Sequence, residues 1–67
     1  MIKWLIEIKD TATVYVEDWT KRTVTLTTDV DEAFGFGSEG EAVKMMNLMP
    51  PEITEHLIAR SHEWVED

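Results

Sequence analysis

The sequence predicts a single α+β domain, in which an antiparallel sheet of three to four strands carries one helix on one face. Three observations predict this class. Apolar and polar residues alternate through most of residues 1–28, which is the two-residue period of half-buried strands. After Ser38 the apolar spacing becomes helical, and the proline pair at 50–51 ends it. A chain of 67 residues has room for only one small core, so residues 1–67 are expected to form one domain.

Three strands are expected in the first part of the chain. Residues 2–8 carry apolar side chains at every even position, so the even side should be the inner one. The second strand is expected over residues 12–16, followed by a turn over residues 18–21 that contains Trp19. The third strand, over residues 22–28, is rich in β-branched side chains. Because the connections are short, the three strands should form an antiparallel meander.

One helix is expected in the middle of the chain. Ser38 and Glu41 form the Ser-x-x-Glu pattern of a capping box, which marks a helix start. Apolar side chains then recur at helical spacing, and the helix is expected over residues 39–48. The methionines near its end are expected to fill the core rather than to form a binding surface.

The last segment, residues 52–67, fits two structures. As a helix, it would place Ile53, Leu57 and Trp64 on one apolar stripe. As a strand, it would pair an otherwise open edge and widen a sheet that is a thin platform for a helix. The open edge favours the order β-β-β-α-β, and β-β-β-α-α is the alternative.

Motifs that would indicate an enzyme are weak, and we predict no catalytic residue, no cofactor and no metal. Without cysteine, the chain has neither a disulfide framework nor a thiolate metal site. Residues 35–40 match the G-x-G-x-x-G pattern of a dinucleotide loop, but Glu39 and Glu41 would repel a pyrophosphate from the helix start. On a strand, His56 and His62 are too far apart to share a metal without other ligands.

The sequence gives no indication of export or membrane insertion. The charge of Glu7 comes before the apolar stretch of a signal peptide could form. No apolar run approaches the roughly 20 residues of a membrane span. We therefore expect a cytoplasmic protein.

Charge is the most informative property of the chain. The sequence holds 14 acidic and 6 basic residues, so its net charge is −8. This charge argues against binding to nucleic acid or an anionic membrane and favours a basic protein partner. Residues 1–28 hold four acids and four bases, so the whole excess falls in residues 29–67. The candidate partner-binding carboxylates are Asp29, Asp31, Glu32, Glu39, Glu41, Glu52 and Glu55.

These carboxylates have two possible roles, in partner binding or in solubility alone. In an extended chain, Asp29 and Asp31 would project to the same side and form an anionic row that resembles a phosphate backbone. Alternatively, the acidic surface only keeps the protein soluble. Trp19 and Trp64 are harder to bury than Trp4, and an exposed tryptophan is a plausible anchor in an interface. We therefore add both to the candidate partner-binding residues.

Residues 28–42 run from a strand end through an acidic turn, an alanine and an aromatic residue to Ser-x-x-Glu-Ala. Together with the alternating Trp-containing start and the closing segment His62–Val65, they resemble small acidic phage and prophage proteins of the anti-CRISPR type. The resemblance extends over roughly half the chain and implies a closing strand. It also implies a phage-encoded inhibitor that works in the cytoplasm of a bacterial host. Such an inhibitor would cover a basic DNA- or PAM-recognition surface of an effector complex as an acidic DNA mimic.

A second function from another class is also open. The chain would then be a small structural or assembly accessory protein, a homodimer joined through an exposed strand edge or through the Met-rich helix end. In that case the acidity would serve solubility alone.

Overall fold

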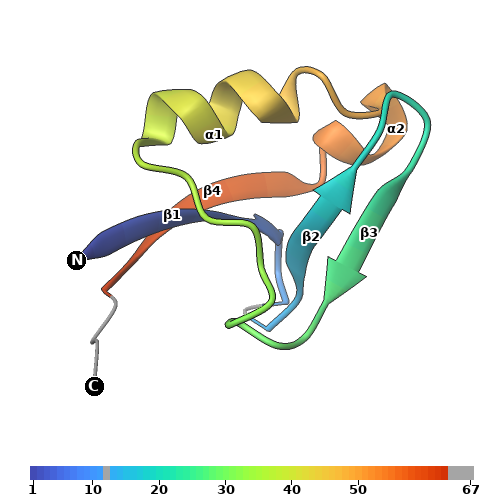
Figure 1. Ribbon diagram of the computed structural model, residues 1–67. Helices are drawn as coiled ribbons and strands as arrows, with labels where there is room; N and C mark the ends of the chain where they lie inside the picture. The colour runs from blue at the N-terminus through green and yellow to red at the C-terminus, as the bar shows by residue number, and fades with distance from the viewer. Residues whose placement is uncertain (12, 64–67) are drawn as a thin grey trace.

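In the computed structural model, four strands form one antiparallel sheet in the order β3-β2-β1-β4. Figure 1 shows α1 lying along one face of this sheet, above β1 and β4. The structure describes residues 1–11 and 13–63. The elements are β1 (Ile2–Ile8), β2 (Tyr15–Trp19), β3 (Val24–Thr27), α1 (Glu39–Met46), α2 (Pro51–Thr54) and β4 (Leu57–Glu63). The α+β class and the strand that follows the helix are confirmed, and α2 is an additional single turn.

Strand β1 lies inside the sheet and pairs the start of the chain with its last described strand, β4. It pairs with β4 over seven consecutive residues, from Ile2 opposite Glu63 to Ile8 opposite Leu57. Pro51 starts the short helix α2, which turns the chain back so that β4 runs antiparallel to β1. The last described segment is therefore a strand, because its backbone groups find partners on β1 that a local helix pattern does not reveal.

Strand β2 begins and ends later than the sequence predicts. It covers Tyr15–Trp19 rather than residues 12–16, of which Ala12 lies outside the described residues. Its register with β3 shifts between Val16 and Asp18, which is a β-bulge. The extra residue lets both Val16 and Trp19 pack against the core, although strict alternation would place them on opposite faces. Trp19 is thus in a strand, not in the expected turn.

The turn between β2 and β3 lies at residues 20–23. The Thr20 N–H donates to the Thr23 carbonyl at 2.8 Å, and the Thr20 hydroxyl accepts from the N–H groups of Arg22 and Thr23. Because these bonds hold Arg22 and Thr23 in the turn, β3 starts at Val24 rather than at Arg22.

The main core lies between the sheet and the helices. Its buried residues come from every layer of the fold: Ile6, Val16, Phe36, Ala42, Met49 and Leu57. Met45 and Met46 pack against this cluster, in line with a core role. Helix α1 ends at Met46, two residues before the expected end, and Leu48 is exposed beyond it. In the described part of the chain, no helix has the length and apolar character to cross a membrane.

The opposite face of β1 is buried as well. Leu5 and Glu7, on the odd side, are 0% and 3% exposed, so the expectation of a single inner face is wrong. Tyr15, opposite Glu7 on β2, is also buried. Side chains of the two neighbouring strands help to cover this face, because Tyr15 of β2 and His62 of β4 meet edge-on beside Glu7.

The N-terminus of α1 is capped as predicted. The Ser38 hydroxyl accepts from the Glu41 N–H at 3.2 Å, and the Glu41 carboxylate accepts from the Gly37 N–H at 3.0 Å. We expect Ser38→Ala to lower the free energy of unfolding by about 1 kcal/mol, because one helix N–H loses its acceptor. Urea denaturation measures this loss. Ser38→Asp, which keeps an acceptor, should stay close to wild type, and an equal loss in both variants would contradict the capping role.

Candidate partner-binding site

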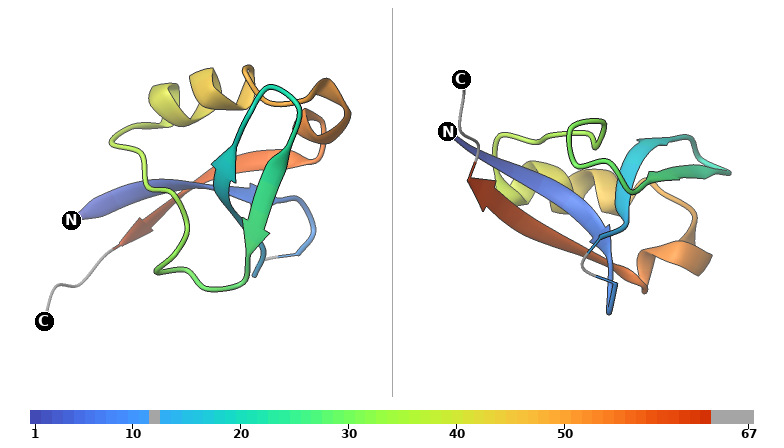
Figure 2. Two further views of the ribbon diagram at one scale, coloured as in Figure 1. Left: turned by 45° about the vertical axis from the view of Figure 1, so that its right-hand side comes forward. Right: turned by 90° about the horizontal axis from the view of Figure 1, so that it is seen from below.

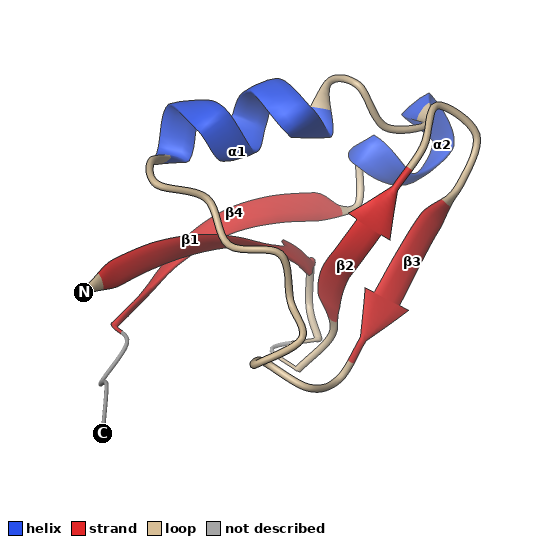
Figure 3. Cartoon of the chain, viewed as in Figure 1, coloured by secondary structure: helices blue, strands red, loops and turns tan. Residues whose placement is uncertain are grey.

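The connection from β3 to α1 is a long loop that is pinned to the sheet. Figure 3 shows it crossing from the end of β3 past β1 to the start of α1. The Phe34 N–H donates to the Val16 carbonyl at 3.0 Å. Phe36 and Trp4 exchange two backbone hydrogen bonds, of 2.9 and 2.8 Å. Because these bonds fix the backbone, the loop presents its side chains in set positions.

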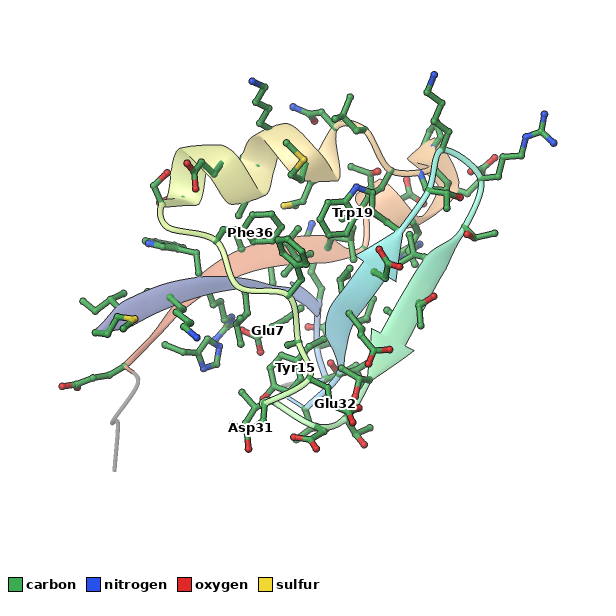
Figure 4. The ribbon with its side chains drawn as sticks, viewed as in Figure 1. Glu7, Tyr15, Trp19, Asp31, Glu32 and Phe36 are labelled. Atoms are coloured by element: carbon green, nitrogen blue, oxygen red, sulfur yellow. The ribbon has the colours of Figure 1, made fainter. Side chains whose placement is uncertain are left out.

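Three aromatic rings meet where this loop contacts β2. The ring centroid of Phe34 lies 5.0 Å from that of Trp19, edge to face, and 5.0 Å from that of Phe36. Phe36 is buried, and Trp19 is half-buried. Figure 4 shows the two rings side by side between the sheet and α1. Phe34 is 47% exposed. A large apolar side chain thus stands in solvent on a rigid aromatic base, which is the form of an interface anchor.

Just before Phe34, the loop carries Asp29, Asp31 and Glu32, which we call the acidic turn. The Asp29 carbonyl accepts from the Glu32 N–H at 3.0 Å, and the Asp29 carboxylate accepts from the Asp31 N–H at 2.9 Å. All three residues are exposed. Figure 4 shows Asp31 and Glu32 at the end of the molecule away from α1.

The acidic turn differs from the expected extended row. Strand β3 ends at Thr27, whose hydroxyl accepts from the Asp29 N–H at 3.0 Å. The side chain of Asp29 then closes a local turn on Asp31. The carboxylates therefore come from one closed turn rather than from an extended row with regular spacing.

The charge of the acidic turn is not neutralised within the described part of the chain. None of its three carboxylates forms an ion pair with a described residue. Lys21 and Arg22 lie in the turn at the other end of the β2–β3 pair. The length of the β2–β3 pair therefore separates the acidic turn from these two bases.

The other four predicted carboxylates lie elsewhere. Glu39 and Glu41 are in the first turn of α1, where Glu41 serves as a cap. Glu52 is in α2, and Glu55 follows it, with its carboxylate 3.2 Å from the His56 ring. Figures 1 and 2 show the start of α1, α2 and the loop after β3 at three separate places. The seven residues are thus not one surface, and among the described residues only the acidic turn adjoins an exposed aromatic side chain.

Of the two predicted tryptophans, Trp19 takes part in this site. Its ring supports Phe34, and on its other side it lines a shallow hollow of about 430 Å³ with Leu48 and the turn residues Thr20 and Lys21. Trp64 lies outside the described residues. We define the acidic-aromatic patch as Asp29, Asp31, Glu32, Phe34 and Trp19.

Sequence reasoning did not single out a second polar cluster, on the sheet face opposite α1. The Glu7 carboxylate lies 3.1 Å from the His62 ring nitrogen and 3.9 Å from the Arg60 guanidinium. The Tyr15 ring meets His62 edge-on at 5.9 Å. Figure 4 shows Glu7 and Tyr15 on this face. Because the Glu7 side chain is only 4% exposed, we interpret the cluster as structural.

His62→Ala should lower the free energy of unfolding by about 2 kcal/mol, because the buried Glu7 carboxylate loses its hydrogen-bond partner. Glu7→Gln keeps a side chain that can bond to His62 and should cost less. Urea denaturation of both variants at pH 7 measures the difference. An unchanged stability for His62→Ala would show that the contact contributes nothing to folding.

Comparison of the chain with protein-family models, curated protein sequences and solved structures found no significant match.

Proposed function

We propose that this chain is a phage-encoded inhibitor that binds a basic, nucleic-acid-binding surface of a bacterial defence complex, as an anti-CRISPR protein. The observation that supports the proposal is the acidic-aromatic patch. It combines three exposed carboxylates, free of ion pairs to described residues, with the exposed ring of Phe34. The inhibitor would act in the cytoplasm of the host cell, where such complexes meet DNA.

The carboxylates would replace DNA phosphates electrostatically. A Lys/Arg surface built for nucleic acid attracts a protein of net charge −8 and speeds their encounter. The attraction also releases ions, as DNA binding does. A folded scaffold strengthens the binding further, because its carboxylates are already in place and little side-chain entropy is lost when the partner binds.

The shape of the acidic turn narrows the kind of surface it fits. Its carboxylates come from residues within one turn, whose backbone is closed by the Asp29–Glu32 hydrogen bond of 3.0 Å. A compact anionic group of this size suits a short pocket of a few lysines or arginines, such as one that reads a PAM. A long duplex channel would need a row of charges, so the proposal favours the pocket.

Phe34 would add binding affinity that electrostatic attraction alone does not provide. Electrostatic attraction steers and orients partners, whereas buried aromatic side chains dominate the affinity. The Phe34 ring rests against Trp19 and Phe36, so it can be covered by a partner without losing further freedom. The partner should therefore have an apolar side chain or an arginine stem beside its basic pocket.

A DNA-displacement assay tests the proposal. Purified CRISPR effector complexes with labelled target DNA are titrated with the chain, and the bound DNA is measured. We expect at least one complex to lose its DNA, with an inhibition that weakens as salt is raised. If every complex keeps its DNA at saturating concentrations of the chain, the proposed function is wrong.

A further inference from the structure

Strand β4 forms one edge of the sheet, and its outer backbone groups are unpaired among the described residues. The Lys9 N–H donates to the His56 carbonyl at 2.7 Å, which fixes the phase of the β1–β4 ladder. Backbone bonds in an antiparallel pair alternate in direction, so every second residue of β4 bonds to β1. The N–H and C=O groups that point away from the sheet are those of Leu57, Ala59, Ser61 and Glu63.

This edge has only part of the usual protection against pairing with another strand, namely the charged side chains of Arg60 and Glu63. Exposed edges are commonly short, bulged, or occupied by proline or lysine. The opposite edge, β3, follows this rule, because it has four residues and pairs with β2 across a bulge. Strand β4 has seven residues, contains neither proline nor lysine, and keeps its register with β1 without a shift.

The edge is also the part of the molecule where two acidic chains can approach. Strands β1 and β4 carry two bases, Lys3 and Arg60, and two acids, Glu7 and Glu63, so this ribbon has no net charge. The whole chain has a net charge of −8. Two copies would therefore repel each other least along this ribbon.

We propose that β4 pairs antiparallel with β4 of a second copy about a two-fold axis, joining the two four-stranded sheets into one continuous sheet. A two-fold axis pairs both open edges at once, so neither copy keeps an unpaired edge there. In the fully overlapping register, Ala59 lies opposite the partner's Ser61, and both have backbone groups that point outward.

At the centre of that register, the same residue of both copies meets across the two-fold axis. Arg60 lies opposite the partner's Arg60, and two like charges in that position oppose pairing. Each Arg60 guanidinium lies 3.9 Å from the buried Glu7 carboxylate of its own chain, which offsets the repulsion. The acidic-aromatic patch takes no part in this pairing, so the dimer and the proposed inhibitory function can fail independently.

Sedimentation equilibrium of the full chain over a concentration series tests the dimer. We expect a mass of twice 7.8 kDa at the upper end of the series. High salt should preserve or strengthen the dimer, since it screens the repulsion between two anionic chains. Complexes made through the acidic turn should weaken under the same conditions.

Two variants of Ser61 locate the interface. Ser61→Pro removes an N–H that points away from β1, so it costs no bond within the chain but blocks a partner strand. We expect it to be monomeric with an unchanged circular dichroism spectrum. Ser61→Thr keeps the N–H and should remain a dimer.

Three results would overturn the proposal. One is a wild-type chain that stays monomeric up to about 1 mM, where even weak pairs associate. Another is a dimer that persists in a folded Ser61→Pro variant, since its interface would lie elsewhere. If that variant does not fold, amide hydrogen exchange of the wild-type chain shows whether β4 is in the interface. The N–H groups of Ala59 and Ser61 should become protected as the dimer forms, and rapid exchange in the dimer would exclude pairing through β4.

Discussion

Replacing Phe36 by alanine should lower the free energy of unfolding by about 3–5 kcal/mol, the usual cost of deleting a buried phenylalanine ring. Phe36 is 7% exposed and contacts the rings of Trp19 and Phe34. A domain of 67 residues has a total stability of about 3–10 kcal/mol. The variant should therefore be marginally folded or unfolded at room temperature.

Urea denaturation monitored by tryptophan fluorescence measures this loss, because Trp4 and Trp19 pack against the core that contains Phe36. Phe34→Ala is the matched control. It removes the same ring from a position that is 47% exposed, so it should cost less than about 1 kcal/mol. Its effect on partner binding should be large, because the anchor is gone while the fold remains. If Phe36→Ala and Phe34→Ala destabilise the fold equally, Phe36 is not the buried support and Phe34 is not the exposed anchor.

Neutralising the acidic turn should lower the affinity for the partner by about 100-fold or more, as expected when several charges at one interface centre are lost. The variant combines Asp29→Asn, Asp31→Asn and Glu32→Gln. Amide side chains keep an oxygen acceptor, so the bond from the Asp31 N–H to residue 29 can persist and the turn should keep its shape. Competition with labelled DNA for the effector complex measures the affinity.

The matched control removes the same charge from other parts of the molecule. Glu52→Gln, Glu55→Gln and Glu63→Gln together also change the net charge from −8 to −8 + 3 = −5. This variant should stay within about 3-fold of wild type, because distant charges mainly alter steering. If the two variants lose affinity equally, binding depends on net charge and not on the acidic turn.

Much of the fold could be predicted from local signals. The alternation over residues 2–8 predicts β1 with the correct bounds, and Ser38 with Glu41 predicts the first residue of α1. The bulge between Val16 and Asp18 has no such signal, because it exists only in the pairing of β2 with β3. The prediction of β2 therefore came too early in the chain, and Trp19 was assigned to a turn.

The site was predictable in composition but not in geometry. Charge counting singled out Asp29, Asp31 and Glu32, yet their conformation depends on side-chain bonds from Thr27 and Asp29 that end the strand. Phe34 carries no recognisable pattern, since its role depends on contact with Trp19, 15 residues earlier in the chain. Glu7 and His62 are 55 residues apart, and only the pairing of β1 with β4 brings them together.

Hydrogen–deuterium exchange of the chain, alone and bound to an effector complex that we propose it inhibits, tests the acidic-aromatic patch most directly. Exchange should slow on binding in residues 29–34 and in the adjoining part of β2, whereas exchange at the start of α1 and in α2 should change little. Protection confined to α1 or α2, with residues 29–34 exchanging as in the free chain, would contradict this expectation.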